Sequence, residues 1–296
     1  MESATLQADV LEASPTAARE SRDWRSILRL GKVDGAALIL ALSAVPLSIA
    51  VSESLLAVAI VARIVRCARG EAPIRLPRVF WFWLAWAALE LLVWAVSADR
   101  ESGWNEIRRL FLIAGLFFVM PALDRQALRL AAWRGVFLSS TLGAVFVIGD
   151  FVARLAYYRH EIAAGDDVSF YLRTGGLLNH WMVYGTVEIL VVAGLLSFWF
   201  LYPEERRRWW PVAALNALAI LLSLTRMLWV GGLLLLGIML VWRRSRWLWA
   251  LPLLPLALYF AAPETVRSRV KVSMNPDYYS NFERIQMWRV GWSMVK

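Results

Sequence analysis

The apolar residues of this chain are gathered into long blocks between about residues 35 and 262, and short polar or charged connections separate them. Several blocks approach the roughly 18 to 20 residues that an α-helix needs to cross the hydrocarbon core of a bilayer. The pattern therefore predicts an all-α, polytopic transmembrane protein with about nine spans. We place these spans at roughly 35–50, 52–67, 79–96, 107–122, 132–153, 181–202, 209–224, 227–242 and 247–262.

Two of the connections between predicted spans are very short. The first two spans are expected to be separated by a tight turn near residues 52–54. The seventh and eighth form one apolar block of 34 residues, from Trp209 to Trp242, which is too long for a single crossing. A charged residue is costly at the centre of a bilayer, so we expect Arg226 to lie where this block re-emerges at the far surface.

The distribution of basic residues predicts the orientation of the spans. With a cytoplasmic N-terminus, the cytoplasmic segments hold 19 basic residues and the outer segments before the C-terminal tail hold seven. This excess is typical of cytoplasmic loops. The predicted organisation is a cytoplasmic N-terminal tail (1–34), about five spans (35–153), an outer loop (154–180), about four further spans (181–262) and an outer C-terminal segment (263–296).

Composition supports this class of protein. Apolar and aromatic residues make up 59% of the chain and charged residues 19%, with a mean hydropathy of +0.54, which argues against an ordinary soluble enzyme. The net charge of +9 is explained by the basic cytoplasmic loops, so no nucleic-acid partner is expected. The chain has no Asp-x-Asp, two-histidine metal or phosphate-loop motif, and we expect neither a metal nor a cofactor.

Two arginines on the predicted outer side are candidates for binding an anion. Arg173 opens the sequence Arg-Thr-Gly-Gly at the end of the outer loop, where the glycines allow the backbone to come close to a bound group. Arg226 is flanked by apolar sequence, where a guanidinium group is costly unless it meets an anion or water. The structural alternative is an ion pair between Arg226 and an intramembrane carboxylate, either Glu90 or Glu188.

The C-terminal segment predicts a surface helix. Its apolar residues recur at spacings of three and four, which places them on one face, and we expect the basic residues to be available to the other faces. The apolar stripe consists of Phe282, Ile285, Trp288, Trp292 and Val295, and the basic residues are Arg284, Arg289 and Lys296. Such a helix is expected to lie on the outer membrane surface, close to the level of the lipid headgroups. Arginines at this level suit a membrane-embedded anion such as a lipid pyrophosphate.

Three segments of the second half resemble the conserved motifs of the O-antigen ligase and O-antigen polymerase superfamily. Residues 173–180 resemble its Arg-x3-Leu segment, residues 223–229 its Ser-x-Ser-Arg-Gly-x-Trp segment and residues 283–288 its Glu-Arg-x-x-Met/Leu-Trp segment. The resemblance covers about residues 170–296. Thr225 and Met227 stand where the family usually has serine and glycine.

The resemblance implies a metal-independent, inverting glycosyltransferase of the bacterial inner membrane. Its donor would be an undecaprenyl-diphosphate-linked glycan at the outer face, and its acceptor another glycan or lipid A-core. The arginines would bind the lipid pyrophosphate and offset the charge on the leaving group. The substrate-binding residues implied are Arg173, Gly176, His180, Arg226 and Arg284.

The family's histidine that activates the acceptor hydroxyl has no counterpart here, since neither His160 nor His180 occupies its position. It is expected beyond Lys296, so the chain reads as an incomplete copy and its catalytic residue is unknown. Three other functions stay open. A different polyprenyl-sugar glycosyltransferase would use Glu53, a transporter or flippase of lipid-linked glycan would use Glu90, Glu188 and Arg226, and a catalytically incomplete protein would only bind the lipid pyrophosphate.

Overall fold

The computed structural model describes residues 32–295, without 98, 167, 169, 170, 179, 262, 263, 274 and 276. Most of the predicted N-terminal tail (1–34), together with Asn179 of the first motif and Lys296, lies outside this described part. The described residues form helices, turns and irregular connections and contain no strand, which confirms the all-α prediction for them. The chain divides into two compact units, residues 1–139 and 140–296.

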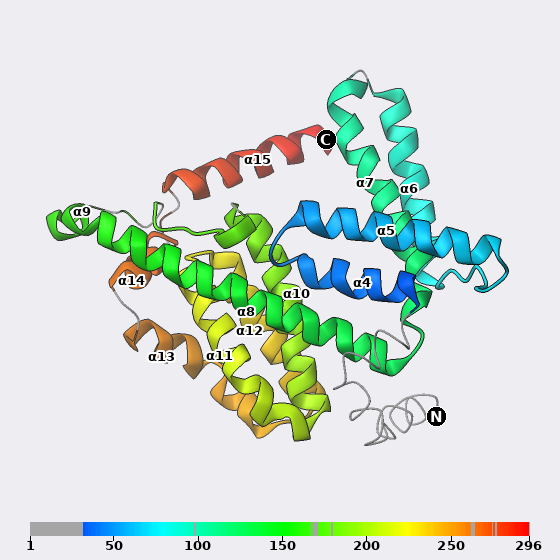
Figure 1. Cartoon of the computed structure of the whole chain (residues 1–296). Helices are drawn as coiled ribbons and strands as arrows, with labels where there is room; N and C mark the ends of the chain where they lie inside the picture. The colour runs from blue at the N-terminus through cyan, green and yellow to red at the C-terminus, as the bar shows by residue number, and fades with distance from the viewer. Residues whose placement is uncertain are drawn as a thin grey trace. The chain divides into compact units, whose positions relative to one another are not determined.

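Within its described residues, the first unit contains four α-helices and the beginning of a fifth (Figure 1). They are α4 (Val33–Ala44), α5 (Ile49–Ala68), α6 (Val79–Val96), α7 (Arg100–Val119) with the 3-10 turn η1 (Met120–Leu123), and the first part of α8 (Gln126–Tyr157). The turn between α4 and α5 occupies Val45–Ser48, so the predicted turn at 52–54 is wrong and those residues lie inside α5. Ser48 caps α5 by accepting a hydrogen bond from the amide of Val51, which fixes the helix start there.

A buried ion pair joins the two ends of this helical hairpin. The carboxylate of Asp34 is fully buried and accepts hydrogen bonds from Arg63 at 3.3 Å and from Arg66 at 2.5 Å. Arg63 also donates to the carbonyl of Pro73, which holds the following connection against α5. Arg63 and Arg66 are two of the 19 basic residues that the sequence assigns to cytoplasmic segments, and both lie within α5.

The second unit contains the rest of α8 and the helices that follow it. They are α9 (Arg159–Ala164), η2 (Gly176–Leu178), α10 (Trp181–Leu201), η3 (Pro203–Glu205), α11 (Arg206–Leu222), α12 (Arg226–Trp242), η4 (Arg246–Ala250), α13 (Leu253–Ala261), α14 (Glu264–Ser273) and α15 (Tyr279–Val295). Helix α10 packs against both α11 and α12, and α8 contacts α10 and α11 where Ala144 and Val147 meet Tyr184 and Ala219.

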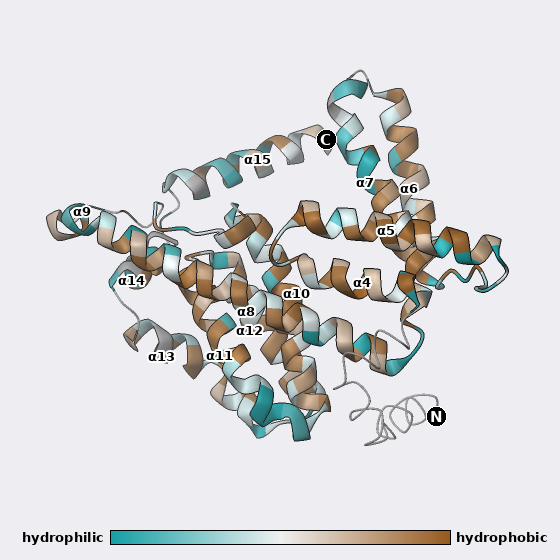
Figure 2. Cartoon of the chain, in the orientation of Figure 1, coloured by the Kyte–Doolittle hydropathy of each residue, from teal (hydrophilic) through white to brown (hydrophobic). Residues whose placement is uncertain are grey.

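Consecutive helices that run in opposite directions bring distant residues to one end of this unit. Helix α10 begins, α11 ends and α12 begins at the same end, which we call the arginine end (Figure 1). The other end carries the 202–208 connection, whose hydrophilic residues stand out against the apolar helices in Figure 2. The predicted break at 223–226 is confirmed, because α11 stops at Leu222 and α12 starts at Arg226.

Three described helices are long and apolar enough to cross a membrane by length and composition: α6, α8 and α10. The other predicted spans correspond to helices that are shorter or carry more charge, as in the twelve-residue α4. The stretch 247–262 is divided into η4 and the nine-residue α13, with Pro252 in the turn between them. Nine residues of helix measure about 14 Å, so α13 alone is too short for a hydrocarbon core of about 30 Å.

Candidate functional site

A strained turn presents Arg226 at the arginine end. Leu224 adopts a left-handed conformation with φ of 52°, which is uncommon for a residue with a branched side chain, and its side chain is fully buried. The Ser223 hydroxyl donates to the carbonyl of Ile220 and accepts from the amide of Thr225. The indole of Trp229 donates to the same Ile220 carbonyl at 3.1 Å. These bonds close the end of α11 and set Arg226 at the first turn of α12.

The loop that carries Arg173 is anchored to α8. The hydroxyl of Thr174, which is fully buried, donates to a carboxylate oxygen of Asp150 at 2.5 Å and accepts from the amide of Gly176. Asp150 also pairs with Arg154, and Arg154 donates to the carbonyl of Tyr171. The backbone on both sides of Arg173 is therefore fixed, and its guanidinium lies over the ring of Trp181 at 5.4 Å.

Two of the expected substrate-binding residues have structural roles here. Gly176 has φ of 54°, and a Cβ at this position would lie 2.8 Å from the side chain of Val147 in α8. Gly176 thus allows its loop to approach α8 closely, and this contact with α8 is the one that requires a glycine. His180 is the N-cap of α10, where its Nδ1 accepts from the amide of Met182 and its ring stacks on Trp181. Neither Gly176 nor His180 lines the cavities described below.

The last two helices contribute further arginines. Arg269 of α14 is 1% exposed, and its Nη1 donates to the hydroxyl of Tyr278 at 3.1 Å. Arg284 lies in the second turn of α15 and is exposed. The apolar stripe of α15 includes Ile285 and Trp288, and Arg284 and Arg289 border that stripe along one shallow groove. A second exposed apolar strip of α15 consists of Met287, Val290 and Met294.

These segments line a partly open basic cavity of about 340 Å³. Four arginines line it: Arg173, Arg226, Arg269 and Arg284. Its other walls come mainly from the start of α10 and the 223–228 turn. Arg226 and Arg284 interact electrostatically, and the interaction is repulsive because both groups are cationic. Within the described part of the chain, no carboxylate lines this cavity or pairs with Arg226 or Arg284. Such a site favours an anionic ligand.

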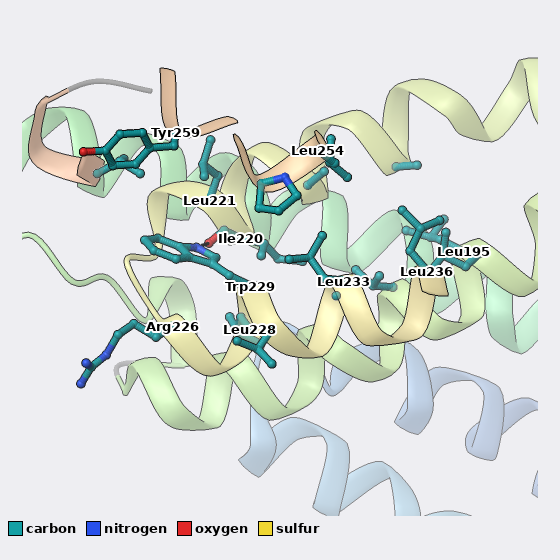
Figure 3. A pocket seen from close by; sticks show the side chains of 18 of the residues that line it. Leu195, Ile220, Leu221, Arg226, Leu228, Trp229, Leu233, Leu236, Leu254 and Tyr259 are labelled. Carbon is teal, nitrogen blue, oxygen red and sulfur yellow. Dashed lines mark hydrogen bonds between the residues drawn. The ribbon is translucent and has the colours of Figure 1, made fainter. Parts of the chain in front are cut away.

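An apolar cavity of about 850 Å³ adjoins the basic one. It is lined by residues of α10 to α15, and its charged lining residues among those described are Arg226 and Arg284. Figure 3 shows aliphatic and aromatic side chains around this space, with Arg226 at its edge and the guanidinium directed away from them. Arg226, Leu228 and Arg284 line both cavities, so the two spaces meet at these side chains.

The structural alternative for Arg226 does not hold for Glu188. This carboxylate is 1% exposed and lies 3.2 Å from the hydroxyl of Ser140, which donates to Asn216 at 2.6 Å. Glu188 therefore belongs to a buried polar cluster between α8, α10 and α11. Glu90 lies on α6 in the other compact unit. Among the residues whose positions are described, no group of three His, Cys, Asp or Glu side chains could hold a metal ion.

The structure thus brings together three of the five expected binding residues, Arg173, Arg226 and Arg284, and adds Arg269. Sequence reasoning missed Arg269 because it stands in a run of basic residues (Arg267, Arg269, Lys271) whose letters do not reveal which one is buried. Arg267 and Lys271 lie on the same helix and pair with Glu264 instead.

No family model, curated protein or solved structure matches this chain. The class of this protein is therefore defined by its fold and its candidate site. In its described part it is an all-helical protein with membrane-spanning character, and an arginine-lined cavity adjoins an apolar one.

Proposed function

We propose that this protein binds an undecaprenyl-diphosphate-linked glycan at the outer face of the bacterial inner membrane and transfers or polymerises the glycan. One observation carries the proposal: the arginine-lined cavity and the apolar cavity adjoin, and two arginines line both of them. A ligand that fills both spaces needs an anionic head group joined to a long apolar chain. A polyprenyl diphosphate has this chemistry, and its length suits a site at the end of membrane-spanning helices.

The arrangement also suits the chemistry of transfer. In an inverting reaction the acceptor oxygen forms a bond to the anomeric carbon while the bond to the diphosphate breaks, and the diphosphate leaves with the electron pair. Four guanidinium groups around one cavity offset the negative charge that develops on this leaving group. The acceptor hydroxyl must lose its proton to a base, and the described residues of the cavity supply no carboxylate or histidine for that role.

The resemblance of residues 173–180, 223–229 and 283–288 to the O-antigen ligase and polymerase motifs supports the proposal independently of the cavities. Each of these segments contributes one arginine to the basic cavity, although they are separated by up to about a hundred residues of sequence. This convergence is what a shared ligand requires. The proposed membrane location follows from the orientation that the basic loops predict.

The test is a transfer assay with the purified protein in proteoliposomes. An undecaprenyl-diphosphate-linked oligosaccharide is the donor, and lipid A-core or a second donor molecule is the acceptor, with EDTA present throughout. We expect release of undecaprenyl diphosphate together with an extended glycan. Arg226→Gln is expected to abolish this product, whereas the matched control Arg207→Gln, an exposed arginine at the opposite end of α11, leaves it unchanged.

Other outcomes of this assay contradict the proposal in distinct ways. Movement of the labelled donor across the bilayer without an extended glycan would identify a flippase. Donor binding that depends on Arg226, with neither movement nor transfer, would identify a lipid-pyrophosphate-binding protein without activity of its own. Absence of donor binding would overturn the proposed ligand class altogether.

A further inference from the structure

The four arginines of the basic cavity fall into two pairs by position. Arg226 and Arg284 line both cavities and so stand at the junction between them. Arg173 and Arg269 line only the basic cavity. A ligand whose apolar chain occupies the apolar cavity therefore meets the junction pair first. Only the part of its head group farther from the chain reaches the inner pair.

Arg269 is distinguished from the other three by its burial. Its side chain is the largest in the described part of the chain to be almost fully buried. The Tyr278 hydroxyl accepts a hydrogen bond from its Nη1, and the guanidinium carbon lies 5.5 Å from the centre of the same ring. The tyrosine thus fixes the orientation of the guanidinium from one side. A cation removed from water in this way is stabilised when an anion enters the cavity that it lines.

We infer that Arg269, positioned by Tyr278, is the residue through which this site distinguishes a polyprenyl diphosphate from a polyprenyl monophosphate. The inference rests on the proposed function and deepens it. The phosphate attached to the apolar chain is bound by the junction pair in both lipids. A second phosphate, present only in the diphosphate, extends to the inner pair, where the planar fork of Arg269 can donate two parallel hydrogen bonds.

The experiment measures the affinity of the purified 296-residue chain, in nanodiscs, for undecaprenyl diphosphate and for undecaprenyl monophosphate. Arg269→Gln is expected to weaken diphosphate binding about tenfold or more and to change monophosphate binding less than twofold. Arg226→Gln is expected to weaken the binding of both lipids. The matched control is Arg267→Gln, which removes the same charge two residues away on α14, from a side chain that pairs with Glu264, and should alter neither affinity.

Two further variants separate recognition from a purely structural role. Tyr278→Phe keeps the ring and removes the hydroxyl that accepts from Arg269, so the diphosphate-to-monophosphate affinity ratio should fall several-fold. Arg269→Lys keeps the charge and loses the fork, and its ratio should lie between those of the wild type and Arg269→Gln. A structural role would lower thermal stability without changing this ratio. If Arg269→Gln does not fold, Tyr278→Phe and Arg269→Lys still test the inference.

The outcomes that overturn the inference differ from those that overturn the function. If Arg269→Gln weakens the binding of both lipids equally, or of neither, Arg269 is not the residue that distinguishes them. Equal wild-type affinity for the two lipids also overturns the inference, while the proposed ligand class stands. If the wild type binds neither lipid, the proposed function itself fails.

Discussion

Arg226 and Arg284 are 58 positions apart in the sequence, yet both side chains line the basic cavity and the apolar cavity. One comes from the turn that opens α12 and the other from the beginning of α15. In the described part of the chain neither has an acidic partner, and their mutual repulsion is relieved when an anion binds between them. This pair is the junction on which the proposed function depends.

Replacing Arg226 with lysine tests whether charge alone is sufficient at the junction. Lysine keeps the positive charge and loses the planar fork that binds two phosphate oxygens at once. We expect Arg226→Lys to weaken polyprenyl diphosphate binding about tenfold, and Arg226→Gln to weaken it further. Equilibrium binding in nanodiscs measures both. Equal affinities of the lysine variant and the wild type for polyprenyl diphosphate would show that only the positive charge at position 226 contributes to binding.

The conformation of Leu224 predicts an unusual order of stability. In a core, replacing leucine with alanine is ordinarily less harmful than replacing it with glycine. At φ of 52° the order should reverse, because glycine relieves a backbone strain of about 1–2 kcal/mol that alanine retains. Both variants lose the packing of the Leu224 side chain in the core cluster that also contains Phe151 and Val266. Thermal unfolding in detergent should therefore show Leu224→Gly to be the more stable of the two.

Gly176 is expected to be required for packing. Alanine at this position would place its Cβ 2.8 Å from the Val147 side chain on a backbone of positive φ, and we expect a loss of stability of about 1–3 kcal/mol. The double variant Gly176→Ala, Val147→Ala removes the collision and keeps the strain, so it should recover only part of the melting temperature that Gly176→Ala loses. Full stability of Gly176→Ala alone would contradict this role.

Breaking the ion pair at Asp34 is expected to destabilise the α4–α5 hairpin strongly. Asp34→Asn leaves the buried guanidinium of Arg63 without its counter-charge, which should cost about 3–5 kcal/mol. The control is Glu106→Gln, which breaks an ion pair with Arg109 whose side chains are about two-thirds exposed, and it should cost no more than about 1 kcal/mol. Denaturation of the purified variants compares the two. Equal costs would mean that burial does not decide the strength of the Asp34 pair.

The sequence predicted the helices better than the turns between them. Long apolar blocks require helices, since an uninterrupted apolar segment satisfies its backbone groups internally, and α6 coincides with its predicted span at 79–96. The turn after α4 was misplaced because the pattern of apolar residues continues through it. Pro46 and the capping hydroxyl of Ser48 determined its position. The stretch 247–262 read as one span because hydropathy does not register Pro252, which lies in the turn between η4 and α13.

For the candidate site, the sequence determined which residues are unusual and the tertiary structure decided what they do. An arginine amid apolar residues is costly wherever it lies, so Arg226 could be singled out from the sequence alone. The roles of Gly176 and His180 depend on what lies opposite them, which proved to be Val147 and the first turn of α10. Arg269 could be separated from Arg267 only by the folded chain. Whether a side chain is buried depends on residues that are remote in sequence and pack around it in the folded chain. In this protein such residues bury Arg269 and, together with it, line the basic cavity.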